Sequence, residues 1–567
     1  MTSNPDDSMT TGARLLVDAL IHRGARMAFG VPGESYLAVL DALYDQQDRL
    51  RFITCRHEAA AANMAEAYGK LTGQPGLAFV TRGPGATHAS IGLHTAFQDS
   101  TPMMLFIGQV ARQMIDREAF QEIDYRRFLS EVTKWTGEVG EPSRMTEYVG
   151  RAWSTALAGR QGPVALALPE DVLSAECGAD PHEARVQASR PAHKAVQASP
   201  HSDDVRAVAE LISQAKRPFI LAGGGPWTEQ EAKQLRQFAE KAGIPLAVSF
   251  RAQSLVDNRS SAYAGHLGIG ADPGLVAHVQ KADLLLVLGP RLGEMTTDGY
   301  RRLKPPYPAQ KMVHVHAGAE ELGRVYQPDL AINAAPGLFI DALANEGVPR
   351  DVAGRWADWG ALNVAQERAW RAPVSNPGGV QLAALYAHLR AALPDEAIIT
   401  NGAGNYAAFL HRFFEYRGFR TQLAPTSGAM GYAVPAGIAA ALVHRDRPVI
   451  SVAGDGCFLM SGNELATAVR YQAKLVFLVL NNGFYGTIRM HQERHYPGRV
   501  SGTDLSNPDF VAYARSFGME GFLVEHSDDF APALARARAT DGPALIEIRV
   551  DREAISPTAR LGNLGRA

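Results

Sequence analysis

Two short polar motifs in the last third of the chain each follow an apolar run. Gly454-Asp455-Gly456 comes directly after one run, and Asn481-Asn482 comes directly after the next. Carboxylate and amide oxygens are hard ligands that suit a small octahedral cation which also holds phosphate oxygens. The glycines let the backbone and a helix N-terminus approach a phosphate closely. The spacing therefore predicts a site for a divalent metal and a phosphate group at the carboxyl ends of two parallel strands.

A third polar motif lies near the start of the chain. Glu58 opens a segment of helical period, and the turn Gly83-Pro84-Gly85 follows the next apolar run. From the residues alone, two interpretations of Glu58 stay open. It is either a carboxylate that the dipole of a helix N-terminus stabilises, or a group that takes part in catalysis.

Alternating apolar runs and amphipathic segments must position these motifs. Runs of strand length, such as 77–80, 284–288 and 475–480, are almost continuously apolar, and helix-period segments such as 203–214 lie between many of them. This alternation predicts the α/β class, with parallel sheets that helices cover on both faces. Polar stretches at 177–200 and, less clearly, at 356–377 divide the chain into three predicted domains, 10–175, 200–345 and 378–556.

The composition excludes several classes of protein. The 567 residues carry 56 basic and 59 acidic side chains, a net charge of −3. The chain therefore lacks the excess of basic residues that is typical of proteins that bind nucleic acid or an anionic membrane surface. The three cysteines, Cys55, Cys177 and Cys457, are widely spaced, which is typical of a reducing compartment. No apolar run reaches the ~20 residues of a membrane-spanning helix, and the N-terminus lacks a signal-peptide pattern. We therefore expect a cytoplasmic protein with no nucleic-acid or membrane partner.

Taken together, the motifs resemble the fingerprint of thiamine diphosphate-dependent enzymes. From about residue 10 to 555, the chain resembles the acetolactate synthase, pyruvate oxidase and pyruvate decarboxylase superfamily, and above all the acetolactate synthase large subunit. The resemblance implies three doubly wound parallel-sheet domains: pyrimidine-binding, central Rossmann-like and diphosphate-binding. It implies thiamine diphosphate and Mg²⁺ as cofactors, with Asp455, Asn482 and the backbone carbonyl of Phe484 as metal ligands.

Arg56-His57-Glu58 resembles the segment whose glutamate contacts the aminopyrimidine ring in acetolactate synthases. A carboxylate beside the ring nitrogen N1′ favours the imino tautomer, whose nitrogen can remove the thiazolium C2 proton. Beside the metal motif, this resemblance favours the catalytic interpretation of Glu58.

Other segments resemble the family's cofactor-binding loops. The loop 427–435 resembles the one beneath the thiazolium ring, where Met430 would wedge the cofactor into a bent shape. The turn at 401–406 occupies the family's first diphosphate-binding turn, although acetolactate synthases usually carry Gln-His at 405 and 406. The residues predicted to bind the cofactor are Gly428, Met430, Asn405, Tyr406, Gly454, Gly456, Cys457, Gly486, Gly83 and Gln109.

The predicted substrate side departs from acetolactate synthase. Met295 falls where the family has a substrate-binding arginine, and His491 falls where it has a specificity-setting tryptophan. Losing the arginine removes a bidentate anchor for a carboxylate. Phe120 and Gln121 match a segment that lines the cofactor cleft, and they complete the predicted substrate residues.

Glu34 is a second predicted catalytic residue. Val31-Pro32-Gly33-Glu34 resembles the segment of pyruvate decarboxylases that carries a catalytic aspartate, and acetolactate synthases have a small residue there. Two interpretations stay open, since Glu34 is either an acid–base group whose pKa desolvation would raise or a solvated loop carboxylate.

A glycine-rich turn, Gly223-Gly224-Gly225, follows a strand of the central domain and is typical of nucleotide-binding turns. However, 267–270 departs from the flavin-contacting segment of acetolactate synthases, where a histidine follows. The sequence therefore leaves FAD, another nucleotide, coenzyme A and an empty turn as alternatives.

The resemblance implies decarboxylation or carboligation of a 2-oxo acid by a homo-oligomer, a dimer or tetramer, with active sites at the subunit interface. Three alternatives stay open because a shared fold does not choose among them. They are a lyase or acyl transferase acting on a 2-hydroxyacyl-coenzyme A or an aldehyde, a flavin-dependent oxidase similar to pyruvate oxidase, and a non-catalytic subunit that binds the cofactor.

Overall fold

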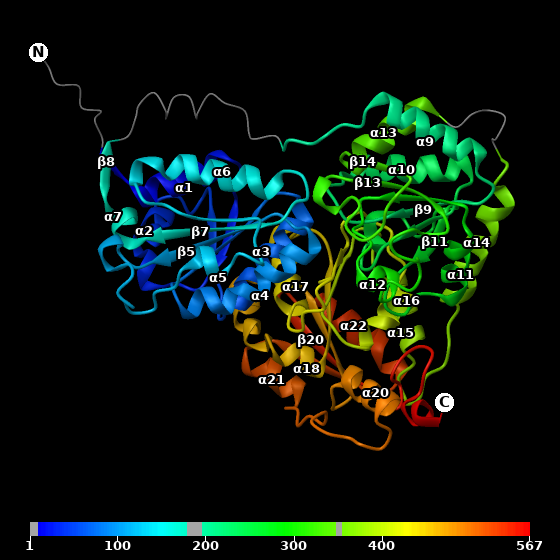
Figure 1. Cartoon of the computed structure of the whole chain (residues 1–567). Helices are drawn as coiled ribbons and strands as arrows, with labels where there is room; N and C mark the ends of the chain where they lie inside the picture. The colour runs from blue at the N-terminus through cyan, green and yellow to red at the C-terminus, as the bar shows by residue number, and fades with distance from the viewer. Residues whose placement is uncertain (1–8, 179–194, 348–353, 567) are drawn as a thin grey trace, which may run out of the picture. The chain divides into compact units, whose positions relative to one another are not determined.

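The computed structural model describes residues 9–178, 195–347 and 354–566. The chain divides into two compact units, residues 1–196 and 197–567 (Figure 1). The first unit contains one six-stranded sheet and the second contains two. Every strand pair within these three sheets is parallel. The α/β fold class with three doubly wound parallel sheets is confirmed, whereas the limits of the three domains stay a prediction.

The sheet of the first unit has the strand order β3-β2-β4-β5-β7-β6. Its central strands are wholly buried, because helices cover both faces and leave no place for polar side chains. The strands are β2 (Met27–Gly30), β3 (Arg51–Thr54), β4 (Gly76–Val80), β5 (Met103–Gln109), β6 (Trp135–Glu138) and β7 (Pro163–Pro169).

Two helices of this unit, α3 and α4, pack unusually closely. A Cβ atom at Gly92 of α4 would lie 2.4 Å from Cβ of Ala62 in α3, so only glycine allows this approach. Figure 1 shows α1 and α6 on the other side of the sheet. The helices are α1 (Gly12–His22), α2 (Leu37–Tyr44), α3 (Glu58–Thr72), α4 (Pro84–Asp99), α5 (Tyr125–Phe128), α6 (Met145–Leu157) and α7 (Glu170–Ser174).

The central sheet, in the second unit, has the order β11-β10-β9-β12-β13-β14. Helices α9, α10 and α13 share one apolar core with it, and α11 belongs to the core of the other face. The elements are α9 (Ser202–Gln214), β9 (Pro218–Ala222), α10 (Glu229–Ala242), β10 (Leu246–Val248), β11 (Tyr263–His266), α11 (Pro273–Lys281), β12 (Leu284–Leu288), α12 (Glu294–Thr297), β13 (Lys311–His316), β14 (Leu330–Asn333) and α13 (Pro336–Glu346).

The third sheet has the order β16-β15-β17-β18-β20-β19. Helices α15, α16 and α22 pack on one face through residues such as Leu389, Leu410 and Phe530. The elements are α15 (Leu382–Ala392), β15 (Ile398–Asn401), α16 (Tyr406–Phe413), β16 (Gln422–Leu423), α17 (Ala433–Val443), β17 (Val449–Gly454), α18 (Asp455–Leu459), α19 (Leu465–Arg470), β18 (Val476–Asn481), α20 (Gly486–His495), α21 (Phe510–Ser516), β19 (Glu520–Val524), α22 (Ser527–Ala539) and β20 (Ala544–Arg549).

Neighbouring strands of the third sheet bring the predicted metal motifs together. In the register of β17 and β18, Gly454 lies opposite Leu480. Asp455, directly after β17, and Asn481-Asn482, at the end of β18, therefore lie at the same carboxyl edge. The loop after β15 reaches this edge too, because Asn401 lies opposite Val452.

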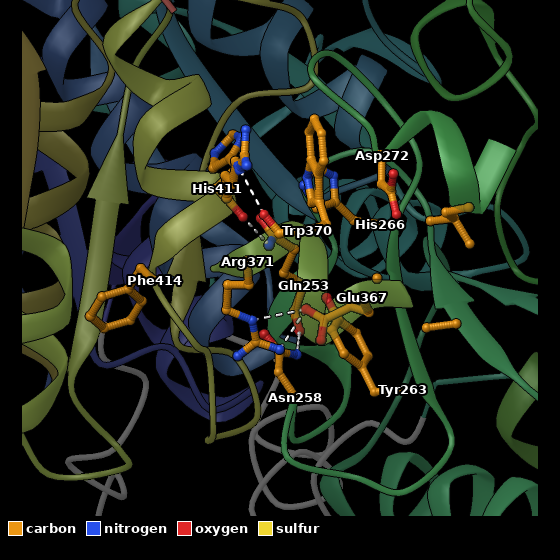
Figure 2. Close-up of a pocket in the computed structure, with 14 residues that line it drawn as sticks. Gln253, Asn258, Tyr263, His266, Asp272, Glu367, Trp370, Arg371, His411 and Phe414 are labelled. Atoms are coloured by element: carbon orange, nitrogen blue, oxygen red, sulfur yellow. Dashed lines mark hydrogen bonds and ion pairs between the residues drawn. The ribbon is translucent and has the colours of Figure 1, made fainter. Parts of the chain in front are cut away.

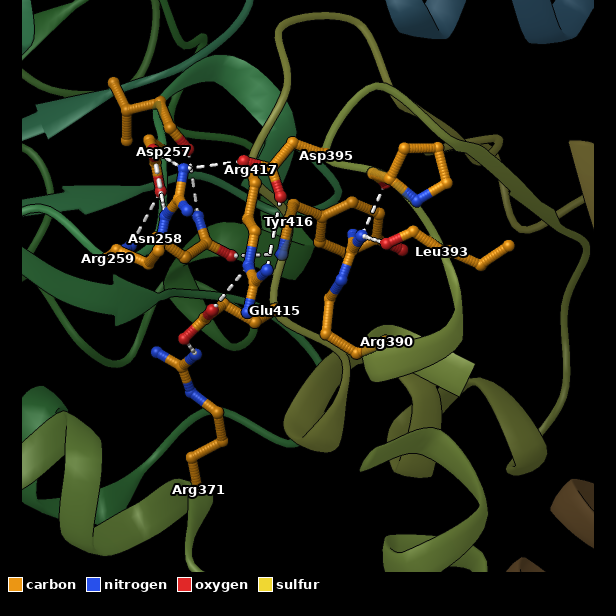
Figure 3. A network of polar contacts seen from close by, with 12 residues as sticks. Asp257, Asn258, Arg259, Arg371, Arg390, Leu393, Asp395, Glu415, Tyr416 and Arg417 are labelled. Atoms are coloured by element: carbon orange, nitrogen blue, oxygen red, sulfur yellow. Dashed lines mark hydrogen bonds and ion pairs between the residues drawn. The ribbon is translucent and has the colours of Figure 1, made fainter. Parts of the chain in front are cut away.

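A network of ion pairs joins the segments around the central and third sheets of the second unit (Figure 3). Arg259 pairs with Asp257 and Asp395, and Arg417 pairs with Asp395 and Glu415. The chain continues through Glu415 to Arg371 of helix α14 (Ala357–Arg371). Acidic and basic groups alternate along it, so the network is a charge-compensated link between segments distant in sequence.

The polar stretches predicted to separate domains differ in outcome. Most of 177–200 lies outside the described residues, but its first residue, Cys177, belongs to strand β8 (Glu176–Gly178), which pairs antiparallel with β1 (Met9–Thr11). The stretch 356–377 contains helix α14. No helix among the described residues is long and apolar enough to cross a membrane.

Candidate functional site

Asp455 lies at the first position of α18 with its side chain buried. Its Oδ2 accepts hydrogen bonds from Gly483 N at 2.9 Å and from Asn507 Nδ2 at 2.7 Å. Burial raises the pKa of the Asp455 carboxyl, and these hydrogen bonds offset the rise only in part. Among the described residues, no basic side chain pairs with it. A buried carboxylate with only neutral partners is a fitting ligand for a cation.

The loop after β18 holds the other predicted metal ligands beside Asp455. Asn482 Oδ1 accepts a hydrogen bond from Phe484 N at 3.3 Å, and Gly483 between them has a positive φ of 70°. Arg552 donates to Asn482 O at 3.2 Å and to Gly483 O at 2.9 Å. The loop is therefore fixed in a tight turn, and its oxygen donors suit Mg²⁺.

Sequence reasoning missed Asn507, which ties this edge together. Its Nδ2 donates to both Asp455 Oδ2 and Asn481 Oδ1, at 2.7 and 3.0 Å. Asn481 in turn donates to Glu547 on β20 at 2.7 Å. The only local signal is Asn507-Pro508-Asp509, which indicates a turn before α21 rather than a contact with residue 455.

The glycines of the metal motif make room for aromatic rings. A Cβ atom at Gly456 would lie 2.6 Å from the Tyr485 ring, and one at Gly454 would lie 3.0 Å from the Tyr406 ring. Part of the space beside these glycines, which the sequence predicts to hold a phosphate, is thus occupied by the two aromatic rings. Helix α18 begins at Asp455 on this edge, and the backbone N–H groups of a helix N-terminus are donors of the kind that bind phosphate.

Tyr406 and Cys457 join three loops of the predicted cofactor site. The Tyr406 hydroxyl accepts from Gly402 N at 3.0 Å and donates to Cys457 Sγ at 3.5 Å, while Gly431 N donates to the same sulfur at 3.3 Å. Burial raises the pKa of Tyr406 well above its usual range, so its hydroxyl stays protonated. Through these contacts, Tyr406 and Cys457 link the loops that contain Gly402 and Gly431, so we assign them a structural role in the site.

Asn405 is bound to the helix that follows the metal loop. Its Oδ1 accepts from Thr487 Oγ1 at 2.9 Å, and its Nδ2 lies 3.5 Å from Met490 Sδ. Gly486, the first residue of α20, lies beside Asn482, because a Cβ atom there would be 3.3 Å from Asn482 Nδ2. Asn405 and Gly486 thus lie at the same edge as the predicted metal ligands.

The loop that carries Met430 contains two residues in the left-handed region. Gly428 has φ 70° and Gly431 has φ 78°, which only glycine adopts readily. Between them, Met430 is half-buried and Gly428 is exposed. This loop shape presents the Met430 segment without a strained non-glycine residue.

In the first unit, Glu58 is paired with a histidine that sequence reasoning had not given a definite role. Glu58 is the first residue of α3, and its carboxylate Oε2 lies 3.0 Å from Nδ1 of His88 on α4. The rings of His57 and His88 lie 4.6 Å apart. The ligand atoms of the three residues lie within 4.8 Å of one another.

Glu34 and the turn at Gly83 lie at the same carboxyl edge of the first sheet, after β2 and β4. Ser35 Oγ and Thr81 Oγ1 are 2.9 Å apart, which joins the two loops. Glu34 is exposed. Gly83 has φ 56°, and a Cβ atom there would lie 2.7 Å from Cβ of Gln121. The structure therefore brings Gln121 against the Gly83 turn.

Phe120 and Gln109 have contrasting surroundings. Phe120 is 74% exposed, and its carbonyl accepts from Arg82 at 3.2 Å. Gln109 is buried, and its amide donates to Ile123 O at 3.0 Å and accepts from Val110 N at 2.9 Å. Both polar atoms of the Gln109 amide are thus occupied by the backbone of its own loop.

The remaining predicted substrate residues lie in the second unit on separate helices. Met295 is half-buried on α12, and His491 is exposed on α20. Partial burial, with Arg494 and His495 nearby, lowers the pKa of His491. No hydrogen bond, ion pair or ring contact between described residues joins Met295 to His491, so their role as substrate contacts stays a prediction.

The glycines at 223–225 have a packing explanation. A Cβ atom at Gly224 would lie 2.8 Å from Gly289 O, and one at Gly289 would lie 2.3 Å from Gly223 O. The ends of β9 and β12 therefore approach too closely for side chains. This close packing explains why the turn consists of glycines even if no nucleotide binds there. It therefore adds no support for FAD.

A small cavity of about 20 Å³ lies in the second unit between β11, α14 and α16 (Figure 2). Its size allows roughly one water molecule. Burial lowers the pKa of His266 to about 4 and that of His411 well below its usual range, so both rings are neutral near pH 7. None of the predicted site residues lines this cavity.

Comparison with known families decides the assignment. The N-terminal TPP binding domain of thiamine pyrophosphate enzymes matches residues 10–128, the central domain of these enzymes matches 205–343, and their C-terminal TPP binding domain matches 402–548. The chain belongs to the thiamine pyrophosphate enzyme family. Membership confirms the resemblance found in the sequence and makes the chain a thiamine diphosphate-dependent enzyme.

Curated members of the thiamine pyrophosphate enzyme family are similar to the chain over almost its whole length. The acetolactate synthase large subunit of Corynebacterium glutamicum is 30% identical, covering 96% of this chain and 87% of its own. That of Parasynechococcus marenigrum is 31% identical, covering 96% and 88%. The acetolactate synthase of Bacillus subtilis is 30% identical, covering 95% and 93%.

Proposed function

We propose that this chain uses thiamine diphosphate and Mg²⁺ to decarboxylate a 2-oxo acid, to join the resulting unit to a carbonyl acceptor, or to do both. The observation that carries the proposal is the buried Asp455 carboxylate, which has only neutral partners among the described residues and lies beside Asn482. The relatives named acetolactate synthase support a 2-oxo acid as the substrate class.

The residues divide the work between binding and proton transfer. When bound, thiamine diphosphate supplies a carbon nucleophile and an acceptor for the electrons released by decarboxylation. Asp455, Asn482 and the Phe484 carbonyl would hold Mg²⁺, which screens the diphosphate charge. Glu58 would hold a proton at the pyrimidine nitrogen N1′. Its side chain is only 13% exposed, which limits competition from water.

The substrate side favours an acceptor other than a second pyruvate. Met295 offers no charge to a carboxylate, and His491 is exposed. An uncharged acceptor such as an aldehyde has no carboxylate, so it does not need the arginine that pairs with one. The flavin oxidase and the coenzyme A-dependent lyase remain alternatives. Visible absorbance of the purified protein would indicate a bound flavin. A rise in melting temperature on adding coenzyme A would indicate the lyase.

A second candidate function is simple decarboxylation to an aldehyde. The position of Glu34 favours it, because Ser35 joins its loop to the Gly83 turn at the carboxyl edge where Glu58 also lies. There Glu34 would deliver the proton that releases the aldehyde.

The family resemblance also supports a homo-oligomer, a dimer or tetramer, in which two copies of the chain complete each active site. Analytical ultracentrifugation with and without cofactor would test this. A monomer at concentrations that sustain full activity would contradict it.

Proton NMR of the protein with thiamine diphosphate, Mg²⁺ and pyruvate, alone and with an aldehyde, tests the function. Glu58→Gln is the matched control. Hydroxyketone or acetolactate would support carboligation, and acetaldehyde alone would support the decarboxylase with Glu34 as proton donor. If neither pyruvate nor larger 2-oxo acids are consumed while the cofactor binds, the substrate class is wrong.

A further inference from the structure

The contact between α3 and α4 places one imidazole against the carboxylate that would activate the cofactor. His88 Nδ1 lies 3.0 Å from Glu58 Oε2. An ionised carboxylate can only accept, so in this pair Nδ1 of His88 carries the proton and donates it. His88 is half exposed, whereas Glu58 is 13% exposed. The histidine is therefore the more solvent-accessible member of the pair.

The backbone around this pair is held in place. Gly92 lets α4 approach α3 closely, since a Cβ atom there would lie 2.4 Å from Ala62 Cβ. His57 fixes the start of α3, because its Nδ1 accepts from Ala59 N at 3.1 Å. The His57 ring lies 4.6 Å from the His88 ring, with 31° between the ring planes. The ring of His88 is thus confined on one face by His57.

The pairing differentiates the two oxygens of Glu58. Oε2 accepts from His88, whereas Oε1 makes no hydrogen bond to the described residues and lies 3.5 Å from the position of a Cβ atom built on Gly85. A carboxylate held by one oxygen presents the other in a defined direction. Oε1 is therefore the oxygen available to a ring nitrogen of the cofactor.

We propose that His88 is a positioning residue for Glu58, which it orients by donating a hydrogen bond from Nδ1 to Oε2 so that Oε1 faces the cofactor. The inference rests on the proposed role of Glu58. It adds a residue that acts through Glu58.

Five variants test the inference, of which Glu58→Ala removes the acceptor in the NMR measurement. His88→Ala removes the donor, and His88→Asn keeps an amide nitrogen near the position of Nδ1. Glu58→Gln removes the activating carboxylate itself. His94→Ala is the matched control, because His94 is an exposed histidine on the same helix. Circular dichroism of each variant checks that it has folded.

Three measurements separate positioning from a general structural role. The ¹⁵N NMR spectrum of the cofactor-free protein should give the Nδ1–H tautomer for His88, and Glu58→Ala should abolish this preference. Calorimetry should give nearly unchanged thiamine diphosphate affinity in His88→Ala, because Asp455 and Mg²⁺ dominate binding. Hydrogen–deuterium exchange at C2 of the bound cofactor should slow by about 10- to 100-fold in His88→Ala, the range for losing a hydrogen bond to a charged group.

The outcomes are distinguishable from failure of the proposed function. Restoration of exchange by His88→Asn, with His94→Ala unchanged, would support the inference. If Glu58→Gln slows exchange but His88→Ala does not, His88 has no positioning role and the function stands. If the wild-type protein binds the cofactor without accelerating exchange, the proposed function fails and the inference fails with it.

Discussion

Asn507 Nδ2 donates a hydrogen bond of 2.7 Å to Oδ2 of Asp455 across 52 residues of sequence. The same nitrogen lies 3.0 Å from Asn481 Oδ1. One amide therefore holds the carboxylate at the start of α18 against the last residue of β18.

This contact predicts that Asn507→Ala weakens metal-dependent cofactor binding. Without the amide, Asp455 loses its shortest neutral donor and its fixed orientation. Residues that orient metal ligands usually contribute about 10- to 100-fold to affinity. Calorimetric titration of thiamine diphosphate in Mg²⁺ measures the loss. Ser506→Ala, at the exposed neighbouring residue, should bind like the wild type, and equal weakening of both variants would argue against the role of Asn507.

Tyr406→Phe should destabilise the second unit. Removing the hydroxyl leaves Gly402 N without its acceptor and removes one of the two donors to Cys457 Sγ. An unsatisfied buried N–H group costs about 1–3 kcal/mol. Urea denaturation followed by circular dichroism measures the change. Tyr496→Phe is the control, because Tyr496 is 66% exposed. A loss no larger than that of the control would show that the buried hydroxyl contributes nothing.

Arg371→Met should be strongly destabilising. Arg371 pairs with Glu367 and Glu415, and the side chains of Arg371 and Glu367 are 17% and 10% exposed. Burial raises the pKa of Glu367, so losing its cation leaves a poorly solvated carboxylate. Breaking such a pair costs about 3–5 kcal/mol.

The matched control for this ion pair is Arg14→Met. Arg14 and Asp45 are each 52% exposed, and pairs of this kind contribute about 0.2–1 kcal/mol. Urea denaturation of both variants gives the comparison. Similar losses in the two variants would mean that the network of Figure 3 adds no more than a surface pair.

The second unit should lose stability as the pH falls from 6.5 towards 4. Burial lowers the pKa of His266 and of His314 from 6.5 to about 4. In that window the unfolded chain binds the protons and the folded chain does not, so the free energy of unfolding decreases as the pH falls. Each histidine accounts for roughly 3 kcal/mol.

Replacing one of these histidines tests the pH dependence. His266→Leu should reduce the slope of stability against pH, whereas His94→Leu, at an exposed position, should not. Urea titrations above, within and below the window give the slopes. An unchanged slope in His266→Leu would mean that this ring titrates normally in the folded chain.

The sequence predicts the central strands well, and the reason is burial. Strand β12 spans Leu284–Leu288, as its continuous apolar run indicates, because both faces of the sheet are covered. Edge strands such as β3 and β6 give a weaker signal, since only one residue in each is fully buried. Their mixed composition carries no clear period.

The candidate site was predictable where its residues follow strand ends. Asp455 and Asn482 lie together because β17 and β18 are adjacent, which strand–helix alternation favours. The contacts of Asn507 with Asp455 and of His88 with Glu58 could not be predicted, because each depends on tertiary packing between segments 30 or more residues apart. Local spacing carries no information about such pairs.

The most direct test of the central claim is a calorimetric titration of thiamine diphosphate into the protein in Mg²⁺, in chelator, and with Asp455→Asn, which keeps the side-chain shape and removes its charge. We predict saturable binding in Mg²⁺ that chelator abolishes and that Asp455→Asn greatly weakens. Binding of equal strength in chelator and in the variant would contradict a metal and diphosphate site at Asp455.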